Sequence, residues 1–156
     1  WWQAAAGVRR QEVLGVGPGR ARIFPRDVPL REPKRWMTGA VAGWPLVVED
    51  CAPVAALPGS AHFTLAPHPR TAVGLSRDRR SLLLFVADGR REGVPGLTLP
   101  ELAALLVEAG ACTALNLDGG GSSALWLRDR IVNRPSDGVE RKVANHLGVV
   151  EVRRKR

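Results

Sequence analysis

The segment 98–110 constrains the fold most, because it predicts one amphipathic helix that must cover another layer. Its apolar residues recur at i, i+3, i+4 and i+7, which places them along one helix face: Leu102, Leu105, Leu106 and Ala109. Thr98 stands three residues before Glu101, the spacing of a capping box, and Gly110 is placed to end the helix. Because a helix with one apolar stripe buries it against other elements, the rest of the chain must supply a sheet.

Short apolar runs on both sides of this helix predict that sheet. "TAVGLS" and "SLLLFVAD" flank the polar "RDRR" and predict a hairpin, while "EVLGVGPGRARIF" predicts two strands around a Pro-Gly turn. "TGAVAGWPLVV" is typical of a buried strand interrupted by Pro45, "ALNL" of a short strand after the helix, and "NHLGVVEV" of a last strand.

These elements predict an α+β fold: a single domain with a mixed β-sheet and few helices. The chain has 156 residues and is 45% hydrophobic, enough for one domain with a real core. We expect an irregular N-terminal segment with short strands over 1–38, the main domain over 39–152 and a basic tail over 153–156.

The net charge of +8 raises the question of nucleic-acid binding. The arginines are, however, scattered through turns, and with no Tyr and three Phe the chain offers few rings on which bases could stack. We therefore expect no nucleic-acid partner. No apolar run reaches the roughly 18 residues of a membrane span.

The two cysteines, Cys51 and Cys112, are too few for a zinc site by themselves. They could pair with each other or remain two buried thiols. No other cluster has the spacing of metal ligands, so we expect neither a metal nor a cofactor.

The run "LNLDGGGSS" is the strongest candidate for chemistry. A strand periodicity of two would point Asn116 and Asp118 to the same face. Gly119, Gly120 and Gly121 would allow a close backbone approach by a ligand, and their N–H groups could cradle an anion beside the Ser122 hydroxyl. The alternative is a glycine turn in which Asp118 only hydrogen-bonds to the backbone.

Three other polar residues stand at the ends of predicted elements. Arg70, in "HPRTAVG", could hold a phosphate in a bidentate contact or form a surface salt bridge. Asp88, in "VADGR", could be a site acid at a strand end or only a turn former. Glu101 could also be a site acid, although the capping box explains it without any chemistry.

In this order, "HPRTAVG", "VADGR", "GLTLPELA", "LNLDGGGSS" and "ERKVANHLGVV" resemble the phosphodiester glycosidase family. The resemblance runs from about Gly39 to Val150, and the Pro-Arg-Thr and Asp-Gly-Gly-Gly-Ser runs are its most specific parts. Family members, many of them bacterial proteins of exopolysaccharide biosynthesis, usually carry an Asn-Gly-Gly-Phe-Phe-like motif further upstream. Nothing in residues 1–38 matches that motif, so we expect the family's N-terminal part to be lacking.

The resemblance implies hydrolysis of the bond between the anomeric carbon of an N-acetylglucosamine-like sugar and a phosphodiester. Arg70 would then hold the phosphate, and Asp118, before Glu101 or Asp88, would be the catalytic carboxylate. The expected substrate contacts are Thr71, Asn116, Gly119, Gly120, Gly121, Ser122 and Arg141.

The resemblance also implies a small-molecule or glycan phosphodiester as the substrate and a periplasmic or secreted location. The main alternative is a non-catalytic module of the same family that binds an anionic glycan or sugar phosphate. A basic protein that binds nucleic acid through "RRKR" is a second, weaker alternative.

Overall fold

The computed structural model describes residues 11–27 and 32–150. The expected basic tail, 153–156, lies outside the described residues, as does the start of the predicted N-terminal segment. No helix among the described residues is long and apolar enough to span a membrane.

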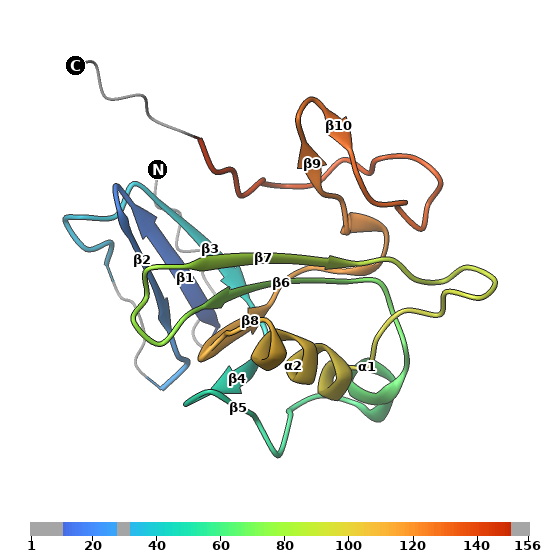
Figure 1. The fold of residues 1–156 in the computed structure, drawn as a ribbon, viewed down its shortest axis with the longest axis horizontal. Coiled ribbons are helices and arrows are strands. Elements are labelled where there is room, and N and C mark those ends of the chain that lie inside the picture. Colours follow the sequence, from blue (N-terminus) through green and yellow to red (C-terminus); the bar gives the residue numbers. More distant parts are fainter. Residues whose placement is uncertain (1–10, 28–31, 151–156) are drawn as a thin grey trace.

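A five-stranded sheet with the spatial order β5-β4-β8-β6-β7 forms the centre of the fold (Figure 1). Its strands are β4 (Leu46–Glu49), β5 (Ala52–Pro53), β6 (Arg70–Leu75), β7 (Leu82–Ala87) and β8 (Thr113–Asn116). The predicted hairpin is present as β6 and β7, whose six residue pairs run from Arg70↔Ala87 to Leu75↔Leu82.

The α+β class is confirmed, but every strand pair in the described residues is antiparallel, and the expected mixed sheet is not seen. The reason is the path of the helix α2 (Leu99–Glu108), which joins β7 to β8. These two strands run in the same direction, yet β6 lies between them and is antiparallel to both. This is a split β-α-β unit, in which parallel strands never become neighbours.

A second sheet, with the order β2-β1-β3, covers one face of the central sheet. Its strands are β1 (Glu12–Gly17), β2 (Arg20–Phe24) and β3 (Gly39–Gly43). Leu14 and Ile23 from this sheet pack with Val73, Leu75 and Leu115 of the central sheet. Because β1 pairs with β3, the chain on both sides of the expected boundary at residue 38 contributes to one sheet.

The helix α2 covers the opposite face of the central sheet (Figure 1). Its capping box is present as predicted, with the side chain of Thr98 accepting from the Glu101 N–H and the Glu101 carboxylate accepting from the Thr98 N–H. Leu102 and Leu106 are fully buried against the sheet. Each such leucine contributes roughly 1.5–3 kcal/mol by leaving water. The predicted stripe is wrong at Leu105 and Ala109, which are exposed, because the buried face of the helix passes through Leu99 and Ala103 instead.

The remaining elements lie around the ends of β6 and β8. The short helix α1 (Ala61–Leu65) precedes β6, the glycine run forms a 3₁₀ turn at Gly120–Ser122, and β9 (Trp126–Leu127) pairs with β10 (Arg130–Ile131). The last predicted strand is wrong for residues 145–150, which are not in a strand; 151 and 152 lie outside the described residues. In this segment Val149 and Val150 are exposed, and no described strand pairs with it.

A disulfide between Cys51 and Cys112 decides the question that the sequence left open for these cysteines. It closes a loop with a sequence separation of 61 and ties the turn after β4 to the residue before β8. The Cys51 N–H also donates to the Cys112 carbonyl at 2.9 Å.

The disulfide gives a stability prediction. Closing a loop of this length lowers the entropy of the unfolded chain, so replacing both cysteines by serine should cost about 4 kcal/mol of unfolding free energy. Urea denaturation of the oxidised wild type and of the double variant Cys51→Ser/Cys112→Ser measures the difference. A loss below about 1 kcal/mol would show that the bond contributes little to this fold.

Candidate active site

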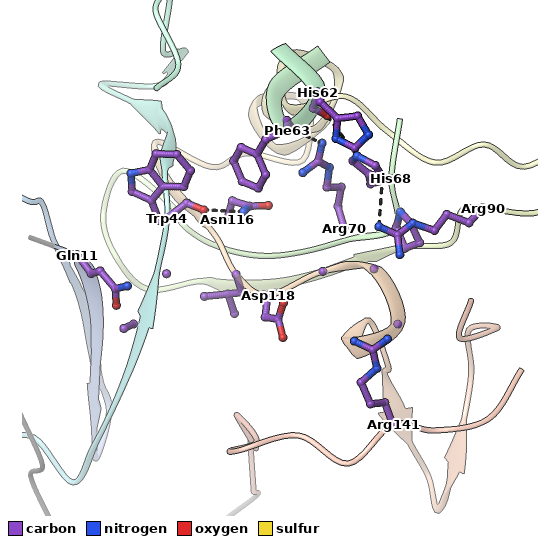
Figure 2. A pocket seen from close by; sticks show the side chains of 17 residues that line it. Gln11, Trp44, His62, Phe63, His68, Arg70, Arg90, Asn116, Asp118 and Arg141 are labelled. Carbon is purple, nitrogen blue, oxygen red and sulfur yellow. Dashed lines mark hydrogen bonds between the residues drawn. The ribbon is translucent and has the colours of Figure 1, made fainter. Parts of the chain in front are cut away.

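A cavity of about 550 Å³ lies where the ends of β3, β6 and β8 meet helix α1 (Figure 2). Of the eleven site residues expected from the sequence, seven line it: Arg70, Asn116, Asp118, Gly119, Gly120, Gly121 and Arg141. The structure therefore brings together residues that are as far apart in the chain as Arg70 and Arg141.

Arg70 is the most deeply placed charge of this cavity, with 3% of its surface exposed. Its Nε donates to the Leu97 carbonyl at 2.9 Å, and its Nη2 donates to the carbonyls of Phe63 at 2.8 Å and Ala66 at 3.2 Å. Phe63 and Ala66 lie at the carboxyl end of α1, where carbonyls lack partners within the helix. Three backbone carbonyls thus fix the guanidinium, and Nη1 has no hydrogen bond to a described residue.

Arg70 is not in a salt bridge with any described residue, in contrast to the alternative interpretation of the sequence. Burial, and second the nearby charge of Arg90, lower the pKa of the Arg70 guanidinium. A buried cation without a counter-charge is costly, and an anion in the cavity would remove that cost.

His68 and Arg90 extend the positive side of the cavity. The Arg90 guanidinium contacts His68 Nδ1 at 3.4 Å, while His68 Nε2 lies 3.3 Å from the His62 carbonyl (Figure 2). Since a guanidinium can only donate, Nδ1 is the acceptor and the proton of the neutral ring is on Nε2. Burial lowers the pKa of His68; the bond to His62 opposes this, and the charges of Arg70, Arg90 and His62 add to it.

This geometry gives a pH prediction. Because the folded-state pKa of His68 is lowered below its ordinary 6.5, the unfolded chain binds more protons just below that pH. Folding stability should therefore decrease as the pH falls from 7.5 to 5.5, and His68→Gln should remove part of that decrease. Urea midpoints measured across this range test it, with the exposed His146→Gln as the matched control. Equal pH slopes in wild type and His68→Gln would contradict it.

Asn116 and Asp118 come from the end of β8. Asn116 is 3% exposed, and its Nδ2 donates to the Trp44 carbonyl at 2.7 Å, while Oδ1 is buried without a partner in the described residues. Asp118 is exposed and has no hydrogen bond or salt bridge to a described residue. It is the only acidic residue among the described residues that line the cavity.

The three glycines have a steric explanation that the sequence did not reveal. A side chain at Gly120, whose φ is +59°, would lie 2.9 Å from Arg90 Nη1, and one at Gly121 would overlap the Asp137 carboxylate. The glycine turn runs between Arg90 and Arg141 (Figure 2). The close approaches at Gly120 and Gly121 are therefore made by the protein's own charged side chains, and the one at Gly119 is made by the Pro69 carbonyl.

The N–H groups of the turn are only partly available to a ligand. The Gly120 N–H donates to the Pro69 carbonyl at 2.9 Å, and the Ser122 N–H closes the turn onto the Gly119 carbonyl at 3.1 Å. The expected cradle of three successive glycine N–H groups is thus wrong at Gly120. The N–H groups of Gly119 and Gly121 donate to no backbone carbonyl in the turns and loops of the described residues.

Arg141 lines the cavity with its charge already paired. Its Nη2 is 2.6 Å and its Nε 2.8 Å from Asp137 Oδ2. It lies against Gly121, so that the pair borders the glycine turn on the side opposite Arg90.

Four expected site residues do not line the cavity: Thr71, Ser122, Asp88 and Glu101. Thr71 neighbours Arg70 on β6 and therefore points to the other face of the sheet, where its hydroxyl hydrogen-bonds that of Ser123 at 3.1 Å. Glu101 accepts from the N–H and hydroxyl of Thr98, both at 2.8 Å, so the capping box accounts for it.

Asp88 holds the chain after β10 against the end of β7. Its carboxylate contacts Arg91 at 3.0 Å, the Asn133 side chain at 3.1 Å and the Arg134 N–H at 2.9 Å. These contacts give it a structural role outside the cavity, so neither Asp88 nor Glu101 is placed as a catalytic acid.

The lining also includes residues that were not expected, among them two aromatic rings, two histidines and one arginine: Trp44, Phe63, His62, His68 and Arg90. The Trp44 and Phe63 rings stack with centroids 5.0 Å apart, and together they form an aromatic wall next to Asn116 (Figure 2). His68 and Arg90 stand inside the motifs "HPRTAVG" and "VADGR", a signal that could have pointed to them. No local pattern marks Trp44, His62 or Phe63.

The cavity of this α+β protein thus combines a buried arginine without a salt bridge, a glycine turn between two further arginines, an exposed carboxylate and an aromatic wall. Such a combination of groups suits a small anionic ligand. Among the described residues no group of three or more acidic, histidine or cysteine side chains could hold a metal ion.

A sequence model of the phosphodiester glycosidase family matches residues 3–150. The chain belongs to this family, and the match begins upstream of Gly39, where the resemblance seen in the motifs begins.

Similar proteins and structures agree with this assignment. The chain is 46% identical over 68 residues to mouse N-acetylglucosamine-1-phosphodiester α-N-acetylglucosaminidase, covering 44% of this chain and 13% of that protein. It is 37% identical over 82 residues to the uncharacterised SPβ prophage-derived protein YomE of Bacillus subtilis, covering 53% and 13%. The matched part is thus a small fraction of these relatives' length.

The fold is also that of a solved relative. The zebrafish N-acetylglucosamine-1-phosphodiester α-N-acetylglucosaminidase catalytic domain, auto-inhibited by its pro-peptide, matches with a TM-score of 0.67 and 22% identity. The match covers 86% of this chain and 48% of that one.

Proposed function

We propose that this chain hydrolyses the bond between the anomeric carbon of an N-acetylglucosamine-like sugar and a phosphodiester. Family membership supports the reaction class. The observation that carries the proposal is that Arg70 and Asp118 line the same cavity: a buried cation fixed by three carbonyls, and an exposed carboxylate. The first suits a phosphate and the second suits catalysis at the sugar.

In this mechanism Arg70 binds the phosphodiester and stabilises the charge that grows on it as the bond breaks. Water attacks the anomeric carbon, the bond from that carbon to the bridging oxygen breaks, and the bridging oxygen leaves with the electron pair as part of a phosphate monoester. Asp118 takes the proton of the attacking water. A phosphate leaving group needs little protonation. This is consistent with the single carboxylate found among the described lining residues, where glycosidases usually use two.

The same single carboxylate favours one alternative, a non-catalytic module that binds a sugar phosphate. Calorimetric titration with UDP-N-acetylglucosamine, followed by measurement of free sugar in the same sample, separates the two functions. Binding with sugar release supports the hydrolase, whereas binding without release supports the module. Neither binding nor release would contradict both.

We also propose an extracytoplasmic location. The disulfide between Cys51 and Cys112 supports it, because such bonds persist in oxidising compartments and are rare in reducing ones. Labelling the protein in intact cells with a thiol reagent that does not cross membranes, before and after reduction, tests it.

A further inference from the structure

We propose that Asn116 selects ligands that carry a hydrogen-bond donor on the sugar carbon next to the anomeric phosphate. This inference rests on the proposed function, because it takes the ligand to be a sugar phosphate. It begins with the one acceptor atom of the cavity lining that is buried and unpartnered among the described residues, Asn116 Oδ1.

The orientation of the Asn116 amide is fixed by chemistry. Its Nδ2 donates to the Trp44 carbonyl at 2.7 Å, and the reversed amide would bring two acceptor oxygens together there. Figure 2 shows the nitrogen toward Trp44 and the oxygen on the side of Phe63 and Arg70. Oδ1 is therefore held as a buried acceptor on the side where Phe63 and Arg70 line the cavity.

A buried amide oxygen without a donor is unfavourable by about as much as a lost hydrogen bond, so the site favours a ligand that supplies one. An O–H or an amide N–H fits this atom, whereas a phosphate oxygen is repelled by it. Oδ1 thus belongs to a part of the ligand other than the anionic group.

The anionic group has its own place on the same face of the sheet. Asn116 lies opposite Ala72, two residues from Arg70, so the two side chains are diagonal neighbours on β8 and β6. The Cα atoms of such diagonal neighbours on two paired strands are about 7–8 Å apart. Both residues line the same cavity. A phosphate at Arg70 Nη1 then brings the nearest ring substituent, that on carbon 2, toward Asn116.

Affinities of matched ligands test this on the wild-type protein. Calorimetry with N-acetylglucosamine 1-phosphate, glucose 1-phosphate and 2-deoxyglucose 1-phosphate compares an N–H, an O–H and no donor at carbon 2. The first two should bind, and the 2-deoxy compound should bind about tenfold more weakly, the effect of one hydrogen bond. Equal affinities for all three would overturn the inference.

A variant assigns the effect to this residue. Asn116→Ala should bind all three ligands with similar, weakened affinity. Asn133→Ala, which removes a half-buried amide outside the cavity, should keep the tenfold preference. A preference that survives in folded Asn116→Ala would overturn the inference. If Asn116→Ala does not fold, the wild-type comparison decides.

Inorganic sulfate separates this inference from the proposed function. Sulfate binding that Arg70→Ala abolishes, together with no preference at carbon 2, would overturn the role of Asn116 and leave the anion site intact. No binding of sulfate or of any sugar phosphate would overturn both.

Discussion

Replacing Asp118 by Asn is expected to lower kcat for sugar release by about 10²- to 10⁴-fold, the contribution of a positioned base. Asp118 is the only carboxylate among the described residues that line the cavity. Asn keeps the size of the side chain and removes only its ability to take a proton. Initial rates of sugar release from UDP-N-acetylglucosamine, with circular dichroism as the folding check, measure the effect.

The variant Glu101→Gln is the matched control for Asp118→Asn. Glu101 was an expected catalytic acid, but its carboxylate caps α2 and does not line the cavity. Glu101→Gln should therefore keep nearly the full rate, because a glutamine at this position can still accept the hydrogen bond of the capping box. A large loss of rate in Glu101→Gln with full activity in Asp118→Asn would reverse the assignment.

Replacing Arg70 by Lys is expected to lower kcat/KM by about 10²- to 10³-fold, the range for losing one preorganised donor to the developing charge. The planar guanidinium of Arg70 donates to three carbonyls and still has Nη1 for a ligand. A lysine ammonium has fewer donors and lacks this planar geometry, so it cannot make all of these contacts at once. Steady-state kinetics and sulfate titration of Arg70→Lys measure both the rate and the anion affinity.

Arg70 also supports the carboxyl end of α1, so its variant needs a control for structure. Thr64→Val removes the hydrogen bond that the Thr64 hydroxyl donates to the Ser60 carbonyl at 3.0 Å. This change disturbs the same helix at a residue that does not line the cavity. It should change kcat/KM by less than about threefold, as expected for a side chain without contact to the ligand. An equal loss in both variants would show that Arg70 acts through the helix alone.

The elements with local signals were predicted well. The capping box and Gly110 define α2 within a short window, although only Leu102 and Leu106 of the predicted stripe are buried. The hairpin of β6 and β7 follows from two apolar runs around a polar turn. The same local reasoning failed at 145–150, where an apolar run found no described strand to pair with. Strand formation depends on a partner, which a single run does not contain.

The residues that line the candidate site follow in part from the sequence, because its motifs concentrate charge and glycine at strand ends. Arg70, Asn116 and Asp118 follow from such positions, and the structure brings them to one cavity. Asp88 was misjudged, because its partners Asn133 and Arg134 are about 45 residues away in the chain and only the fold reveals them. The aromatic wall of Trp44 and Phe63 was missed for the same reason.

The bond that breaks is the most direct test of the central claim. The chain is incubated in ¹⁸O-labelled water with a methyl phosphodiester of N-acetylglucosamine, and the phosphate products are examined by ³¹P NMR and mass spectrometry. We predict free N-acetylglucosamine and methyl phosphate without ¹⁸O, because the bridging oxygen stays with phosphorus when the carbon–oxygen bond breaks. N-acetylglucosamine 1-phosphate, or ¹⁸O in any phosphate product, would show cleavage at phosphorus and contradict the glycosidase account.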